Sequence, residues 1–170
     1  ETEPVLDVNF DLERPASASF GAGQWVVVLA ESGVEEYGAR GRIVFVDPDG
    51  SIVSDENNPF PEFGDDVGPR AAALDPDGTT LIVAVEADDG STDVVSWDLR
   101  TGVELSRRRI IDPFVPGDGR IPFGRQFVSS LDVSDGRILV NVTVVSNEYL
   151  PAGAFLVNPQ GNVVDLSRAV

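Results

Sequence analysis

Short apolar segments recur along the whole chain, with turn-forming residues between them. Two examples are "WVVVLA" at residues 25–30 and "LIVAV" at residues 81–85, both of which are rich in β-branched side chains. Such side chains favour β-strands, whereas the Gly, Pro, Asp and Asn residues between the segments mark turns. No segment remains for a helix. The pattern therefore predicts an all-β protein, with these two segments as inner strands that are apolar on both faces.

The strand pattern occurs three times. The stretches "ASASFGAGQWVVVLAE", "RAAALDPDGTTLIVAVEA" and "VSSLDVSDGRILVNVTVV" each contain a short strand of small residues, a turn and a long apolar strand. In this alignment Phe20, Leu74 and Leu131 occupy corresponding positions. Self-similarity of this kind is typical of proteins built from repeated structural units.

Each unit continues with a third strand, a turn that contains Gly and a short fourth strand. These parts lie in "RIVFVDPDGSIVS", "DVVSWDLRTGVELS" and "GAFLVNPQGNVVDLS", in which Val46, Trp97 and Val157 correspond. We therefore expect a single all-β domain over residues 1–170, with three four-stranded antiparallel, blade-like units. Their approximate boundaries are residues 15–55, 69–107 and 126–167.

Two segments carry a resemblance to β-propellers. The stretch "VVSWDLRTGVEL", with Trp97 and Asp98 before Leu-Arg-Thr-Gly, resembles the end of a third strand and its turn in WD-type blades. The stretch "LDPDGTTLIVAV" is similar to YVTN/lactonase-like propellers. This resemblance implies a blade architecture over about three-quarters of the chain. The buried network of WD repeats requires a Gly-His pair, and the chain has no His, so only the general architecture carries over.

Three blades do not make a ring, because closed propellers contain 4 to 8 blades. Three arrangements stay open: part of a longer propeller, a ring completed by a second chain, or three sheets packed as a β-prism. Residues 4–12 add a further element, since apolar and polar side chains alternate in "VLDVNFDL" as in a half-buried strand. We expect this N-terminal strand to complete a neighbouring sheet, in this chain or in a partner.

The motif Asp-Pro-Asp-Gly at residues 47–50 and 75–78 has two interpretations. Pro sets φ for a turn, Gly permits positive φ, and the Asp carboxylates can accept backbone N–H bonds, so the motif fits a corner between strands. The alternative is a calcium loop, which needs alternating oxygen ligands and a distant bidentate Glu. Neither Asp47 nor Asp75 is followed by that pattern. The corner interpretation is therefore preferred, and we expect no cofactor, with Ca²⁺ as the alternative.

Composition excludes several classes of function. The net charge is -17, which repels nucleic acid and anionic membrane surfaces. The chain has no Cys and no His, so it has no thiolate nucleophile, imidazole base or zinc site of the usual kind. No apolar run reaches the length of a membrane helix. The chain starts at Glu1 and not at Met, which suggests signal-peptide removal, other processing or a boundary within a longer chain; we expect a secreted or cell-surface location.

The predicted loops fall into a tight group and a long group at opposite ends of the units. Long loops on a rigid scaffold are the usual place for binding residues. The long loops are rich in acidic and aromatic side chains, which predicts a binding face at that end. Its candidate residues are Glu35, Glu36, Tyr37, Phe60, Phe63, Glu86, Asp88, Asp89, Phe114, Phe123, Glu148 and Tyr149.

Three functions remain open. The preferred one is a non-catalytic extracellular module that binds a protein partner, a glycan or a second copy of itself. The first alternative is half of a Ca²⁺-dependent, lactonase-like or hydrolase-like propeller enzyme. The second alternative is a structural subunit of a surface layer or filament. No residue is predicted to be catalytic or to bind a metal, because the chain contains no recognisable catalytic motif.

Overall fold

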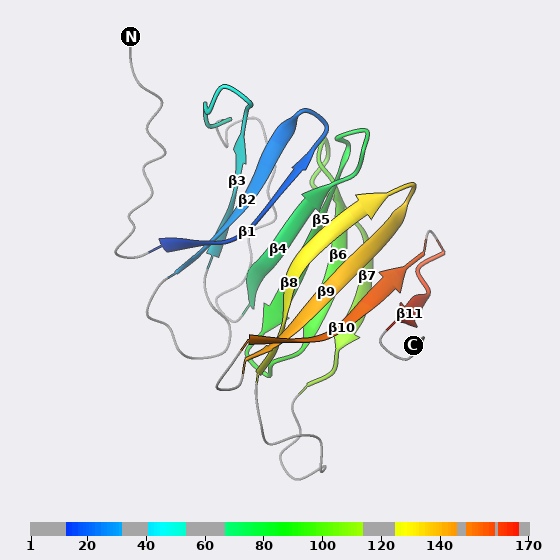
Figure 1. Ribbon diagram of the computed structural model, residues 1–170. Coiled ribbons are helices and arrows are strands. Elements are labelled where there is room, and N and C mark those ends of the chain that lie inside the picture. Colours follow the sequence, from blue (N-terminus) through cyan, green and yellow to red (C-terminus); the bar gives the residue numbers. More distant parts are fainter. Residues whose placement is uncertain are drawn as a thin grey trace.

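The fold consists of three antiparallel β-sheets (Figure 1). The computed structural model describes residues 13–31, 41–53, 67–113, 125–145, 149–158 and 160–166. These residues form eleven strands and contain no helix. Accordingly, none of the described segments is a helix that could cross a membrane. The all-β prediction is confirmed.

Each sheet is a meander in which consecutive strands pair. Sheet 1 contains β1 (Glu13–Gly21), β2 (Gln24–Glu31) and β3 (Gly41–Val46). Sheet 2 contains β4 (Val67–Leu74), β5 (Thr80–Ala87), β6 (Thr92–Asp98) and β7 (Glu104–Ile111). Sheet 3 contains β8 (Arg125–Ser134), β9 (Arg137–Val145), β10 (Tyr149–Val157) and β11 (Val163–Asp165).

Among the described residues, sheet 1 has three strands where four were predicted. One bridge, between Val46 and Ile52, lies where the fourth strand would begin. The other two sheets have four strands each, as expected. The predicted strand at residues 4–12 lies outside the described residues.

The register of the hairpins confirms one predicted correspondence and corrects the other. Val46 pairs with Trp25, Trp97 with Leu81, and Val157 with Ile138, so the three third-strand residues do occupy equivalent places.

In the first strand of each sheet, however, the residue of sheet 3 that corresponds to Phe20 and Leu74 is Val133 and not Leu131. Phe20 pairs with Trp25, and Leu74 with Leu81, in the place where Val133 pairs with Ile138. The reason is the short turn after β8, in which Asp135 and Gly136 both have positive φ, as in a two-residue type I′ hairpin. This short turn lengthens the strand beyond Leu131.

The first strand of every sheet contains one extra residue. The pairing shifts between Pro15 and Ser17 in β1, between Pro69 and Ala71 in β4, and between Val128 and Ser130 in β8. A bulge of this kind bends and twists its strand. The three bent strands lie beside one another and form the inner edge around which the sheets fan out (Figure 1).

Sheet 2 is buried on both faces. One face packs on sheet 1, where Leu81, Val83 and Trp97 meet Val26 and Phe45. The opposite face packs on sheet 3, and the residues of this second core are Ala71, Ala73, Ile82, Ala84, Val94, Ile111, Val128, Leu131, Val140, Val142 and Val157. The prediction that "LIVAV" is covered on both faces is confirmed, since residues 81–85 are all buried; the strand at the inner edge of sheet 2, however, is β4 and not β5.

The Asp-Pro-Asp-Gly motifs are corners between strands. The Asp75 carboxylate accepts the backbone N–H of Thr79 at 2.8 Å and of Thr80 at 2.9 Å. In the first motif, Asp49 accepts the N–H of Ser51 at 2.9 Å, and Gly50 has a φ of 87°. These side chains therefore bond to their own turns, as the corner interpretation predicts.

Candidate functional site

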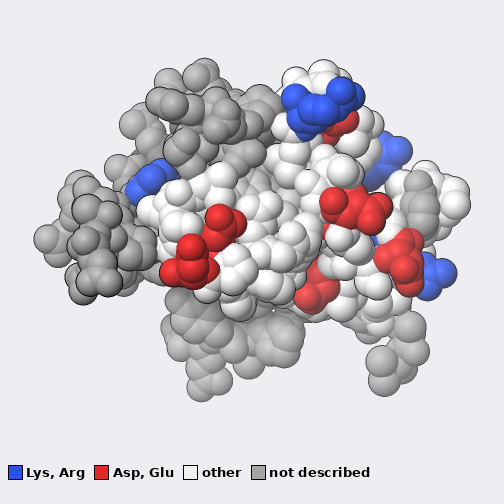
Figure 2. Space-filling view, turned by 90° about the horizontal axis from the view of Figure 1, so that it is seen from above, with Lys and Arg blue, Asp and Glu red and all other residues white. Residues whose placement is uncertain are grey.

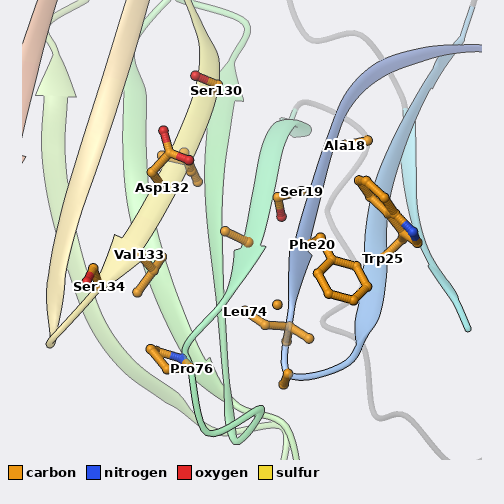
Figure 3. Close-up of a pocket in the computed structure, with 14 residues that line it drawn as sticks. Ala18, Ser19, Phe20, Trp25, Leu74, Pro76, Ser130, Asp132, Val133 and Ser134 are labelled. Carbon is orange, nitrogen blue, oxygen red and sulfur yellow. The ribbon is translucent and has the colours of Figure 1, made fainter. Parts of the chain in front are cut away.

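A groove opens between the inner strands at the end of the molecule that carries the tight turns (Figure 3). Its volume is about 790 Å³, and it lies between β1 and β2 on one side and β8 on the other, with β4 between them. Its lining residues are Ala18, Ser19, Phe20, Gly21, Ala22, Trp25, Ala73, Leu74, Pro76, Ser130, Leu131, Asp132, Val133 and Ser134.

One wall of the groove is aromatic. The rings of Phe20 and Trp25 meet edge to face, with their centroids 5.1 Å apart. Phe20 is 57% exposed and Trp25 is 43% exposed, although both are large apolar side chains; they form the second pair from the turn of the β1–β2 hairpin. Because Val46 pairs with Trp25, and Ile52 with Val46, the four side chains form one row across sheet 1. We call the face that carries this row the outer face of sheet 1.

The opposite wall mixes polar and apolar side chains, since Leu131 and Val133 line it between the polar residues of β8. Ser130, Asp132 and Ser134 of β8 line it (Figure 3). Asn141 donates a hydrogen bond to the Ser130 hydroxyl at 2.9 Å, so this pair is satisfied within sheet 3. Asp132 lies opposite Leu139 on the face of sheet 3 that points away from sheet 2. We call this face the outer face of sheet 3.

A buried ion pair joins β4 to β5. The Arg70 Nε donates to Glu86 Oε2, and Glu86 has no exposed surface. Arg70 is the extra residue of the β4 bulge, which places its side chain beside that carboxylate. Arg70 Nη2 has no hydrogen-bond partner, although it is buried. The prediction placed Glu86 among exposed loop acids; because β5 extends to Ala87, it lies instead in a strand, in the protein interior.

Two other predicted residues do lie on the surface. Asp88 and Asp89 form the β5–β6 turn, and both are exposed. Asp89 Oδ1 accepts the N–H of Ser91 at 2.9 Å. The hydroxyl of Ser91, and then its N–H, hold the pKa of Asp89 below its usual value. The acidic face remains a prediction here, since the turn contains only part of it.

The other residues of the predicted face have side chains outside the described part of the chain. Tyr149 is the first residue of β10, but its side chain lies outside the described part. The remaining candidates, which also lie outside the described residues, are Glu35, Glu36, Tyr37, Phe60, Phe63, Phe114, Phe123 and Glu148.

Charged side chains do not gather in the groove. Seen from the turn end, the carboxylates form separate groups with uncharged surface between them (Figure 2). The basic run on β7 is paired locally, because Arg107 bonds to Glu104 and Asp93, and Arg109 bonds to Asp93. Within the described ranges, no three acidic side chains come together as a possible metal site. The calcium alternative therefore stays a prediction.

Two equivalent turns, one charged and one neutral, allow a pH test. The N–H of Thr101 bonds to Asp98 Oδ1 at 2.8 Å, and this bond, followed by the bond from the Thr101 hydroxyl, holds the pKa of Asp98 below its usual value of 3.8. In the last turn, Asn158 Oδ1 accepts the N–H of Asn162 at 2.9 Å without a charge. A depressed folded-state pKa gives stability that is present above the unfolded-state pKa and is lost as the pH falls through the folded-state pKa.

We therefore expect Asp98→Ala to destabilise the protein at neutral pH, and its difference from the wild type to shrink below about pH 4. Asn158→Ala should show a difference that does not depend on pH. Urea unfolding of both variants and the wild type between pH 7 and about pH 3 measures this. If both differences vary with pH in the same way, the Asp98 charge is not the cause.

The sequence reasoning missed the exposed aromatic pair. Trp25 begins the stretch "WVVVLA", which reads as a core strand, and Phe20 aligns with Leu74, which is buried. The number of predicted units could have indicated this exposure. A stack of three sheets has two end faces, and one of them belongs to the first unit, which contains Phe20 and Trp25. No protein-family model matches the chain, and no curated protein matches it significantly.

Proposed function

We propose that this chain is a non-catalytic extracellular module that acts by binding a protein surface, and that it binds through the outer face of sheet 1. The observation that supports the proposal is the exposed row of Phe20, Trp25 and Ile52 on that face. Single exposed apolar residues are common, but contiguous ones mark interaction sites. Tryptophan and other aromatic residues also contribute most to binding at protein interfaces.

The chemistry of the chain supports binding over catalysis. A chain without His or Cys lacks the commonest general base and the commonest thiol nucleophile. The groove beside the aromatic row contains one carboxylate, Asp132, and the hydroxyls of three serines. A net charge of -17 also disfavours nucleic acid and anionic membranes as partners.

Site-specific photo-crosslinking in the cells that produce the protein tests this. Phe20 is replaced by p-benzoylphenylalanine, and Val103 is replaced in the same way as the control. The two positions match, because each is apolar and 57% exposed, but Val103 lies in the turn after β6, away from the row. We expect position 20 to give a discrete protein adduct in several-fold higher yield than position 103. Equal yields would overturn the proposal.

A further inference from the structure

The contacts between neighbouring sheets repeat one arrangement. On sheet 2, Leu74, Leu81 and Trp97 form a row across three strands, and this row packs on sheet 1. On sheet 3, Val133, Ile138 and Val157 form the equivalent row, which packs on sheet 2. In both cases the row faces the preceding sheet in the chain.

Sheet 1 has the same row, and no sheet precedes it among the described residues. Phe20, Trp25 and Val46 occupy the positions of Leu74, Leu81 and Trp97. Leu74 is buried, whereas its equivalent Phe20 is largely exposed. Leu29 and Val44 lie on the same outer face and are buried. Because this burial arises within the single chain, the part of the outer face that is open to a second copy is the row with Phe20, Trp25 and Ile52.

Sheet 3 offers the matching surface. The rows that receive a neighbour are Ser19, Val26 and Phe45 on sheet 1 and Ala73, Ile82 and Ser96 on sheet 2. The equivalent row on the outer face of sheet 3 is Asp132, Leu139 and Leu156. Val164 of β11 extends it, because it pairs with Leu156, and it is 46% exposed.

We infer that the outer face of sheet 1 binds the outer face of sheet 3 of a second copy of this chain, head to tail. This inference rests on the proposed function and names its partner. The contact would continue the arrangement already made twice within the chain. At both internal interfaces, the row of one sheet that faces the preceding sheet packs on the opposite-facing row of that preceding sheet. Contact between two outer faces of sheet 1 would instead pair two like faces, which occurs at neither internal interface.

The two outer faces also border the same groove. Phe20 and Trp25 line one side of it, and Asp132 lines the other (Figure 3). A sheet that docks on either face therefore covers one wall of the groove. Head-to-tail contacts between different faces produce closed rings when the rotation closes and filaments when it does not. Both assemblies contain the proposed contact.

Light scattering and sedimentation velocity test the inference at an ionic strength that screens the like charges. The wild-type chain should exceed the 18.1 kDa monomer mass in a concentration-dependent manner. Trp25→Asp, on the first face, and Val164→Asp, on the second face, should each weaken association about 30-fold, the effect of losing one interface anchor. Val103→Asp adds the same charge outside both faces and should assemble like the wild type.

Mixing the two face variants is decisive. Each variant alone lacks one of the two faces, but Val164→Asp keeps the first face and Trp25→Asp keeps the second. An equimolar mixture should therefore form a pair of about twice the 18.1 kDa mass. Formation of the pair also shows that both variants fold. A second variant on the outer face of sheet 3, Leu156→Asp, should behave like Val164→Asp in this mixture.

Three outcomes would overturn the inference. One is a mixture that stays at the monomer mass. Another is a variant on the outer face of sheet 3 that assembles as well as the wild type, which indicates contact between two outer faces of sheet 1. The third is a monomeric wild-type chain; if position 20 still gives a specific adduct with another protein in that case, the proposed function stands and only the identity of the partner is wrong.

Discussion

Replacing Arg70 by leucine should lower the free energy of unfolding by about 3–5 kcal/mol, because it removes one partner of the buried Arg70–Glu86 ion pair. The carboxylate has no exposed surface through which water could replace the lost bond. The loss should appear as a lower midpoint in chemical unfolding, with an unchanged dependence on denaturant concentration.

Two further variants separate the charge from the volume of the side chain. Arg70→Leu combined with Glu86→Leu removes both charges, and we expect it to recover part of the lost stability. Arg107→Leu removes an arginine whose side chain is 46% exposed and paired with Glu104 and Asp93, and it should cost less than about 1 kcal/mol. If Arg70→Leu costs no more than Arg107→Leu, the buried pair does not contribute as proposed.

The two tryptophans should respond to truncation very differently. Trp97→Ala removes a side chain that is 6% exposed and packs between sheets 1 and 2, so it should cost about 3–5 kcal/mol of unfolding free energy. Trp25→Ala removes the same atoms from the outer face of sheet 1, where 43% of the residue is exposed, and should cost about 1 kcal/mol or less.

Unfolding curves of both variants, recorded at a concentration where the wild type is dissociated, give the comparison. The low concentration matters because association through Trp25 would add its own stability. A cost for Trp25→Ala that equals the cost for Trp97→Ala would mean that the outer face of sheet 1 is packed as tightly as the core. That result would contradict the assignment of the row with Phe20, Trp25 and Ile52 as open surface.

Much of the fold was predictable because its local patterns agree with its packing. The long apolar strands, the Gly-containing turns and the correspondence of Val46, Trp97 and Val157 all follow from residues near one another in the sequence. The misplaced partner, Leu131, lies two positions from Val133, so the error kept the side chain on the same face of the sheet. Only the length of the turn distinguishes the two alignments.

The candidate site was less predictable because it depends on contacts between sheets. Glu86 stands just before two surface acids, and only the bulge at Arg70, in another strand, shows why a carboxylate is buried there. Exposure of Phe20 depends equally on a distant fact, the absence of a sheet before the first among the described residues. Neither fact is encoded by residues close in the sequence.

The burial of sheet 2 on both faces has an evolutionary consequence. Sheets 1 and 3 each pack one face on sheet 2, whereas sheet 2 packs on both of them. Within one chain, gain or loss of a unit at either end by gene duplication or deletion would therefore alter a single internal interface, but loss of the central unit would remove both. The stability of such a stack is nearly the sum of the contributions of its units and of the interfaces between neighbouring units. Related proteins should therefore differ in the number of units at the ends of the stack and keep the central unit.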